Sequence, residues 1–198
     1  MTTFLTLDGV YQGPGAPDED RSDGFDEGGW VVPFSDEAFG AFITDAFGQA
    51  DAFLLGRRTY ETWAGIWPAM GDRDPVSTAL NRLPKHVVST TLTTTGWAGS
   101  SILRGDLAAA VGELKAQPGR ELQVHGSGRL VRSLAVLDLV DTYRLLVFPV
   151  VLGTGRRLFE PGSAPVSFRL ASSVTSSTGA MLQTYERAGA VEHGSADA

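Results

Sequence analysis

Apolar residues follow two different rhythms along this chain. Short continuous apolar runs, such as residues 52–55, predict strands that are buried on both faces of a sheet. Apolar residues at helical spacing over residues 38–47 predict a helix with one wide face packed on a sheet, so the aromatic side chains there are assigned to the core. Because the two patterns alternate for most of the chain, we expect an α/β fold with a mainly parallel sheet and helices on both of its faces.

Polar residues mark where several of these elements begin. Ser35 is expected to cap the helix over residues 35–48, with Asp36 in its first turn. Asp74 followed by proline begins a second helix, and Asp106 caps a third. The predicted strands are residues 4–7, 52–55, 85–89, 122–124 and 143–152, and residues 166–186 add two antiparallel strands at one edge.

Composition narrows the class of protein. The 198 residues are enough for one domain, placed at residues 1–187 with a flexible tail over 188–198. The net charge of −7 argues against nucleic acid or an anionic membrane as a partner. No apolar run reaches the roughly 20 residues that a membrane span requires, and no signal peptide is visible. We therefore expect a cytoplasmic protein.

Cysteine and histidine usage excludes several chemistries. The chain has no cysteine, so disulfides and thiol nucleophiles are excluded. Its three histidines, His86, His125 and His193, fit no metal-binding spacing, and no metal is expected. Serine hydrolysis is not supported either, because the G-x-S-x-G motif is absent and Ser127 lacks an evident base.

A long connection over residues 10–33 is rich in glycine, proline and acidic residues. Connections of this length are uncommon in compact domains and are often functional lids. Trp30, which follows two glycines, favours a lid that folds over a substrate. A disordered acidic loop is the alternative interpretation.

Two glycine-bearing turns carry the main candidate chemistry, at residues 56–59 and 126–130. Each follows a predicted buried strand and begins a helix, so unpaired backbone N–H groups and the helix dipole point at one place. Two such places suit a ligand with phosphates at two positions, such as a dinucleotide. The second turn lacks the third glycine of a dinucleotide fingerprint because Val131 stands there, and a plain tight turn is the alternative.

Charged and hydroxyl side chains surround the first turn. Arg57 and Arg58 suit phosphate contacts but oppose the helix dipole, a penalty that a bound anion would offset. Solvated surface arginines are the alternative. Ser89 and Thr90 follow the next predicted strand and are able to offer hydroxyl groups to the same phosphate, since ligands gather at the carboxyl ends of such strands.

Taken jointly and in this order, the motifs resemble the dihydrofolate reductase-like fold. The chain is most similar to stand-alone relatives of the reductase domain of the bifunctional riboflavin-biosynthesis deaminase–reductase, and the resemblance covers nearly its whole length. The motifs that carry it are Thr6-Leu7-Asp8-Gly9, Leu55-Gly56-Arg57-Arg58-Thr59-Tyr60-Glu61, Val88-Ser89, Gly126-Ser127-Gly128-Arg129-Leu130, Leu139-Val140-Asp141 and Phe148-Pro149-Val150-Val151-Leu152-Gly153.

The resemblance implies NADPH as cofactor and a homodimer. By position, the adenosine end would contact Gly56, Arg57, Arg58, Thr59 and Ser89, with Arg57 or Arg58 on the 2′-phosphate. The pyrophosphate would contact Gly126, Ser127, Gly128, Arg129 and Leu130. Tyr11 would lie near the nicotinamide.

The residues that would act on a substrate are harder to assign. Asp8 ends the first strand and is expected to face the cleft as a substrate contact or proton relay, with a turn residue as the alternative. Asp36 is the best-placed acidic residue of the next helix, although a first-turn role is its alternative. The carboxylate of dihydrofolate reductases would fall near Gly40, so dihydrofolate reduction is not expected.

The sequence therefore predicts an NADPH-dependent reductase of an unidentified pterin-, pyrimidine- or carbonyl-like small molecule. It lacks the zinc deaminase signature of the bifunctional enzyme. A non-catalytic module that binds a nucleotide or small ligand on the same fold is the alternative, and turnover distinguishes the two.

Overall fold

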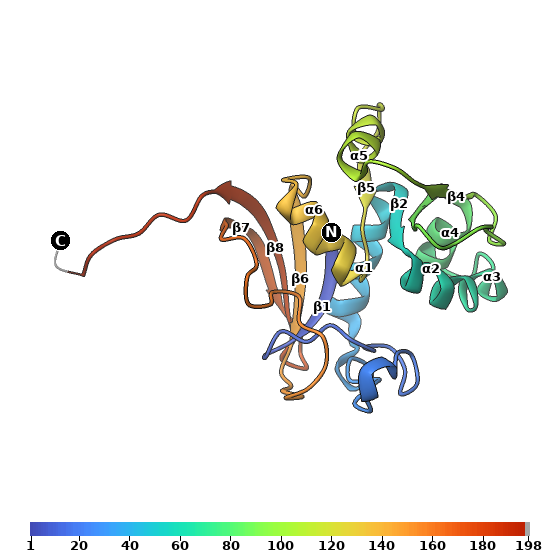
Figure 1. The fold of residues 1–198 in the computed structure, drawn as a ribbon. Coiled ribbons are helices and arrows are strands. Elements are labelled where there is room, and N and C mark those ends of the chain that lie inside the picture. Colours follow the sequence, from blue (N-terminus) through green and yellow to red (C-terminus); the bar gives the residue numbers. More distant parts are fainter. Residues whose placement is uncertain (197–198) are drawn as a thin grey trace.

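The computed structural model describes residues 1–196 (Figure 1). Its strands are β1 (Thr2–Thr6), β2 (Ala50–Gly56), β3 (Lys85–Val88), β4 (Ser100–Leu103), β5 (Glu121–Gln123), β6 (Thr142–Phe148), β7 (Ser167–Thr175) and β8 (Met181–Gly189). Its α-helices are α1 (Glu37–Gly48), α2 (Arg57–Ala64), α3 (Trp67–Met70), α4 (Pro75–Arg82), α5 (Leu107–Lys115) and α6 (Gly128–Val136), and short 3-10 turns cover Ser22–Gly24 and Val32–Phe34.

The strands form two four-stranded halves, in the orders β4-β3-β2-β5 and β1-β6-β8-β7. A short parallel bridge between Thr2 and His125 joins them, and the Thr2 N–H donates to the Val124 carbonyl at 2.8 Å. Among the described strands, β8 pairs antiparallel with both β6 and β7, and the other strand pairs are parallel. This arrangement confirms the mainly parallel sheet with an antiparallel edge.

Helices cover both faces of the sheet, as expected. In β2, Leu54 belongs to the cluster that α5 and α6 complete, whereas Phe53 and Leu55 belong to the cluster with α2 and α4. Successive strand residues point to opposite faces, so these helices lie on opposite sides. In β1, Leu5 belongs to the same hydrophobic cluster as Leu54. Phe4 points to the opposite face, where it packs against α1.

Several boundaries differ from the prediction. Asp36, not Ser35, is the N-cap of α1, and its carboxylate accepts the Phe39 N–H at 2.9 Å. The elements α3 and β4 were not predicted, because four residues are too few to show a periodicity.

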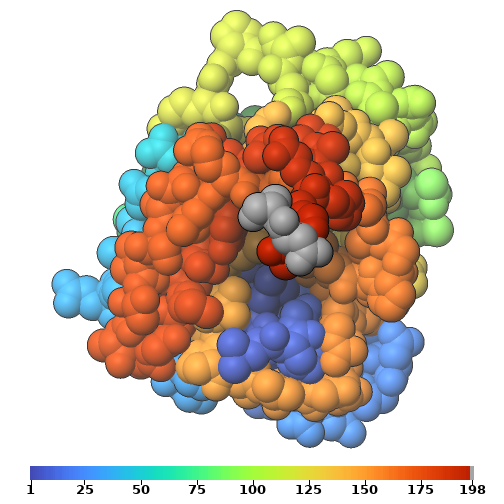
Figure 2. Space-filling view, turned by 90° about the vertical axis from the view of Figure 1, so that its left-hand side faces the viewer, coloured from blue at the N-terminus to red at the C-terminus, as the bar shows by residue number. Residues whose placement is uncertain are grey.

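The predicted tail over residues 188–198 begins too early, because β8 continues to Gly189. Its last two residues lie outside the described part of the chain. The edge strand β7 is exposed along most of its length, and Figure 2 shows β7 and β8 on the surface of this side of the molecule.

The long connection over residues 10–33 is packed against the sheet. Val10, Phe25, Trp30 and Val31 are buried in one cluster with strand residues of β6 and β8. Within the described residues, no helix has the length and apolar character to cross a membrane. The same residues contain no group of histidines and acids suited to a metal ion.

Candidate functional site

The two glycine turns meet in space through Ser127. Its hydroxyl oxygen accepts the Gly56 N–H at 3.0 Å, and the hydroxyl donates to Thr59 Oγ1 at 2.8 Å. Residues 56–59 and 127–130 line one cavity of about 440 Å³, named here the turn cavity. One extended ligand therefore has access to both turns.

The helices that begin at these turns differ from the other helices of eight or more residues in the described chain. Carboxylates cap α1, α4 and α5 at Asp36, Asp74 and Asp106. The N-caps of α2 and α6 are Gly56 and Ser127, and neither makes a side-chain capping bond. The first N–H groups of α2 and α6 consequently have no side-chain acceptor at the cap, which is the arrangement that binds an anion.

Ser127 holds an unusual backbone conformation, with φ 51° and ψ 44° in the left-handed region. Gly126 before it also has a positive φ, of 53°. A left-handed residue other than glycine, asparagine or aspartate is uncommon, and such residues cluster at functional sites. The hydrogen bonds of the Ser127 hydroxyl with Gly56 and Thr59 stabilise this left-handed conformation.

Arginines surround the turn cavity on several sides. Arg57 pairs with Glu61 one helical turn away, at 2.9 Å, and Arg58 donates to Ser22 Oγ at 3.2 Å. Arg129 is exposed beside the α6 N-terminus. Arg156 was not predicted, because it lies in a loop more than 130 residues from its partners in the long connection.

Arg156 fixes the long connection at the mouth of the turn cavity. It forms ion pairs with Asp20 and Asp23, the latter at 3.0 Å, and donates to Ser22 Oγ at 2.6 Å. Because Arg58 donates to the same hydroxyl, Ser22 joins the connection to α2.

Ser89 and Thr90 also line the turn cavity. The Ser89 hydroxyl accepts the N–H groups of Thr91 and Leu92, at 3.2 and 2.9 Å, and thereby orders the turn after β3. The structure thus brings together every residue predicted at the two phosphate sites except Gly126, which faces the neighbouring cavity.

A second cavity, of about 670 Å³, lies beside the first and is named here the aromatic cavity. The two share Tyr11, Asp20, Arg58, Thr59 and Ser127, so they lie next to each other. The apolar wall of the aromatic cavity comes from α1, α2, α3 and α4 through Phe39, Ile43, Phe47, Trp63, Ile66, Trp67 and Val76. Residues 11–16 and 18–20 of the long connection form another wall.

Tyr11 stands at the junction of the cavities and packs on Gly128. A Cβ at residue 128 would lie 2.2 Å from Tyr11 Cζ, so only glycine permits this contact. Tyr11 was predicted near the nicotinamide, and its place at the junction is compatible with that prediction.

His125 is a member of the aromatic cavity that sequence analysis left without a role. It is 5 % exposed and stacks on Phe47, with ring centroids 4.4 Å apart. Burial, helped by the Met1 α-amino group and Arg144, lowers the pKa of His125 to about 3. The imidazole is therefore neutral at physiological pH. The sequence feature that would have indicated a role for His125 is its position directly before the second glycine turn.

The structure corrects the assignment of Asp8, which does not line either cavity. Its carboxylate accepts from the Thr6 hydroxyl at 2.6 Å and the Gly153 N–H at 3.0 Å, and it pairs with Arg157 at 3.0 Å. Burial acts to raise its pKa, but the bonds from Thr6, Gly153 and Leu152 dominate and lower the pKa of Asp8 to about 2. Asp8 therefore joins two loops, and its carboxylate is ionised near neutral pH.

Asp36 and Trp30 are likewise corrected, because neither lines the two cavities. Besides capping α1, Asp36 accepts from the Ser177 N–H at 2.8 Å and the Ser177 hydroxyl at 2.7 Å. Trp30 is buried against Phe148, and its Nε1–H donates to the Gln12 carbonyl at 2.8 Å. Trp30 therefore anchors the long connection and does not face a substrate.

The carboxylates of the aromatic cavity come from the long connection instead. Burial raises the pKa of Glu19, against a weaker lowering by the N–H groups of Gly15 and Ala16. For Asp20, burial is outweighed by bonds from Ser22 and the charge of Arg156, which lower its pKa. Glu19 is therefore the cavity carboxyl better suited to hold a proton.

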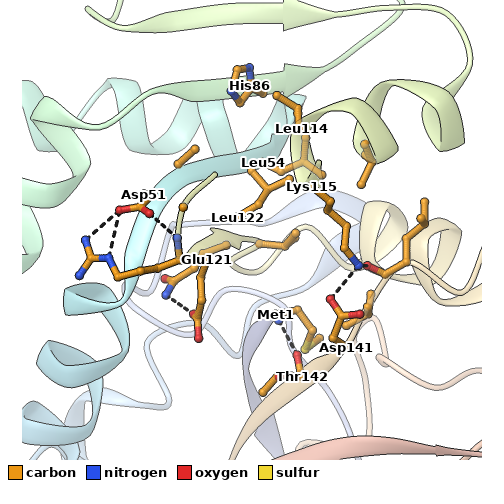
Figure 3. A pocket seen from close by; sticks show the side chains of 18 of the residues that line it. Met1, Asp51, Leu54, His86, Leu114, Lys115, Glu121, Leu122, Asp141 and Thr142 are labelled. Carbon is orange, nitrogen blue, oxygen red and sulfur yellow. Dashed lines mark hydrogen bonds and ion pairs between the residues drawn. The ribbon is translucent and has the colours of Figure 1, made fainter. Parts of the chain in front are cut away.

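A third cavity, of about 370 Å³, lies beneath α5 (Figure 3). Its charged groups are paired, as Lys115 with Asp141, Asp51 with Arg120, Glu121 with Arg144, and the Met1 amine with the Thr142 carbonyl. Because these charges satisfy one another, the third cavity does not present an open set of polar groups to a ligand.

Comparison with known proteins agrees with this architecture. A riboflavin biosynthesis protein of provisional assignment from Shewanella sp. PV-4 superposes with a TM-score of 0.65, at 21% identity over 94% of this chain and 97% of its own. A pyrimidine reductase-like protein from Corynebacterium diphtheriae superposes with a TM-score of 0.62, at 14% identity over 94% of this chain and 90% of its own. The protein has the dihydrofolate reductase-like fold.

The family model named RibD C-terminal domain matches residues 1–182, and the chain belongs to this family. Bacillus subtilis YyaP is 28% identical over 184 residues, which are 91% of this chain and 90% of YyaP. YwjB of the same organism is 25% identical over 141 residues, which are 71% of this chain and 76% of YwjB. Both relatives are uncharacterised, and the family relation suggests an oxidoreductase.

Proposed function

We propose that this protein is an NADPH-dependent oxidoreductase that reduces a small molecule bound in the aromatic cavity. The observation that carries the proposal is that two helix N-termini without side-chain caps meet at Ser127, in a cavity that adjoins a larger apolar one. A dinucleotide has the length and the two phosphate-bearing regions to use both helix ends.

The residues of the turn cavity fit such a cofactor. The first N–H groups of α2, with Arg57 or Arg58, would hold the adenosine end and its 2′-phosphate. The α6 N-terminus, with Gly128 and Arg129, would hold the pyrophosphate. NADPH, when bound, supplies a hydride to the substrate.

The chain's own residues supply the remaining requirements. The apolar wall of the aromatic cavity excludes water from a bound substrate. Reduction by a hydride also consumes one proton, and we assign its donation to the Glu19 carboxyl, which burial favours in the protonated form. The substrate thus gains one hydride and one proton.

Turnover is the direct test of this proposal. The purified protein should oxidise NADPH when supplied with at least one compound from a panel of pterins, pyrimidines and small carbonyls. Binding of NADPH with no oxidation across the panel would favour the alternative, a binding module on the same fold. Absence of NADPH binding would contradict both assignments of the turn cavity.

We also propose that the protein is a homodimer that acts on small molecules, with neither nucleic acid nor a membrane as partner. The net charge of −7 supports the second part. Exposed apolar side chains on β7, at Leu170 and Val174, support the first.

A further inference from the structure

We propose that Lys85 is a positioning residue of the turn cavity. Its buried ammonium group joins the C-terminal end of α4 to Trp97, and it thereby holds the β3–β4 connection, residues 89–99, in place. The first residues of this connection, 89–91, line the turn cavity. The inference rests on the proposed function only in taking NADPH as one probe of that cavity.

The Lys85 side chain lies among the last carbonyl groups of α4. Lys85 is the first residue of β3, and it is fully buried. Its Nζ donates to the carbonyl oxygens of Leu80 at 2.6 Å and Leu83 at 2.8 Å, and it lies 3.4 Å from that of Asn81. The last carbonyls of a helix have no partner within the helix, so the ammonium group satisfies them and complements the helix dipole.

The ammonium group has no carboxylate partner within residues 1–196. The charged and titratable side chains next to it in sequence have other partners, since His86 bonds with Ser101 and Arg82 pairs with Asp72. The β3–β4 connection contains no charged residue. Burial lowers the pKa of Lys85 to about 8, so the group still carries its charge near pH 7.

Trp97 links the ammonium group to two helices. Lys85 Nζ lies 4.5 Å from the centroid of the Trp97 ring, which is the geometry of a cation–π interaction. The Trp97 Nε1–H donates to Asn81 Oδ1 on α4 at 3.0 Å. On α2, the Tyr60 hydroxyl oxygen accepts the N–H of Trp97 at 3.2 Å and that of Gly96 at 3.1 Å. The far end of the connection is therefore fixed to α2 and α4 (Figure 1).

The near end of the connection forms part of the wall of the turn cavity. The Ser89 hydroxyl accepts the N–H groups of Thr91 and Leu92. The Leu92 carbonyl in turn accepts from Arg104. Because the connection is short, a displacement of Trp97 alters the position of this turn and of the groups that it offers to a ligand.

Amide hydrogen exchange, followed by NMR on the ligand-free full-length protein at pH 7.5, tests the positioning role. Lys85→Met keeps the length of the side chain but leaves the carbonyl oxygens of α4 without their donor. We expect four backbone N–H groups to exchange about tenfold faster than in the parent protein. They are those of Thr91, Leu92, Gly96 and Trp97. Lys115→Met, at the other lysine of the chain, is the matched control and should leave these rates unchanged.

Exchange and NADPH affinity are measured on the same variants. The affinity, from calorimetric titration, should fall about tenfold in Lys85→Met and keep its parent value in Lys115→Met. Unchanged exchange at Thr91 and Leu92, or unchanged affinity despite faster exchange, would overturn the positioning role. Faster exchange in Lys85→Met, with no NADPH binding by the parent protein, would sustain this inference and refute the proposed function.

Trp97→Phe is the second variant, for the case that Lys85→Met does not fold. It keeps a ring beside the ammonium group but loses the bond to Asn81, and tryptophan is the stronger partner of a cation. The same N–H groups should therefore exchange faster than in the parent protein, by a smaller factor. Parent-like exchange in Trp97→Phe would contradict the role of Trp97 as the link.

The pH dependence of stability distinguishes a buried ammonium group from simple packing. Between about pH 8 and 10.5, the unfolded chain binds a proton at Lys85 that the folded protein does not, so stability rises with pH in this window. The melting temperature of the parent protein should rise relative to that of Lys85→Met by about 4 °C between pH 7.5 and 9.5. An equal difference at both pH values would show that the charge is not buried.

Lys85→Ala separates charge from volume. n-Propylammonium matches the part of the side chain that this substitution removes, and it should raise the melting temperature of Lys85→Ala more than that of the parent protein. n-Propanol has a similar size and no charge, and it should not. Equal effects of the two compounds would assign a space-filling role to Lys85 and refute the clasp by its ammonium group.

Discussion

At the scale of single residues, Tyr11 packs on Gly128 at the place where the turn cavity and the aromatic cavity meet. We predict that Gly128→Ala weakens NADPH binding about tenfold, because the new methyl group displaces the Tyr11 ring into the junction. Adding Tyr11→Ala should restore part of the affinity by removing the collision. Calorimetric titration measures both effects. Gly112→Ala in α5, where a Cβ meets nothing within 4 Å, is the control, and equal affinities in all variants would disprove this role.

The Glu19 carboxyl gives the proposed reaction a pH dependence. Because burial raises its pKa above the ordinary 4.5, turnover should be greatest at lower pH and fall as the pH rises through the pKa. We predict that Glu19→Gln lowers kcat at least tenfold with little change in NADPH affinity, and that this descending limb disappears. Glu27→Gln, an exposed residue of the same connection, should behave as the parent. A descending limb that persists in Glu19→Gln would assign the proton to another group.

At the scale of elements, the α2 N-terminus is where cofactor selectivity is expected. Arg57→Ala removes an exposed pair with Glu61 and a cation that opposes the helix dipole, so its effect on stability should stay within about 0.5 kcal/mol. We predict that NADPH binding weakens about tenfold or more while NADH binding changes little. Arg82→Ala, which breaks another exposed pair on α4, is the control. Equal losses for NADPH and NADH would remove Arg57 from the 2′-phosphate.

Local features of the helices could be predicted from the sequence, whereas contacts between distant parts of the chain could not. Asp74 and Asp106 cap their helices as predicted, because a capping bond is local and needs only a short polar side chain before the helix. Asp8 and Asp36 were misassigned, since their partners at Gly153 and Ser177 are more than 140 residues away. Arg156 was missed for a similar reason, because its partners lie more than 130 residues away. No periodicity indicates that His125 faces a cavity.

At the scale of the whole molecule, the parallel sheet explains why the candidate site lies where it does. Gly56 ends β2, and Ser89 and Ser127 follow the carboxyl ends of β3 and β5. In a parallel sheet these ends meet at one edge. The order of strands was not available from the sequence. We nevertheless expected the two turns to share one surface, because each of them comes after a strand of a parallel sheet.

The exposed edge of the sheet is the expected contact between two copies. Leu170 and Val174 on β7 are 49 % and 47 % exposed. We predict that light scattering during size-exclusion chromatography gives the mass of a dimer, and that Leu170→Glu with Val174→Glu gives a monomer. Val136→Glu, an exposed site on α6, is the control. A monomeric parent protein would contradict the homodimer.

The central claim is that the N-termini of α2 and α6 hold the two phosphate-bearing regions of a single dinucleotide. A crystal structure of the protein grown with NADPH measures this directly. The account predicts one NADPH per chain, with its 2′-phosphate at residues 56–59 and its pyrophosphate at residues 126–130. An NADPH molecule bound elsewhere, or density at only one of the two turns, would contradict the account.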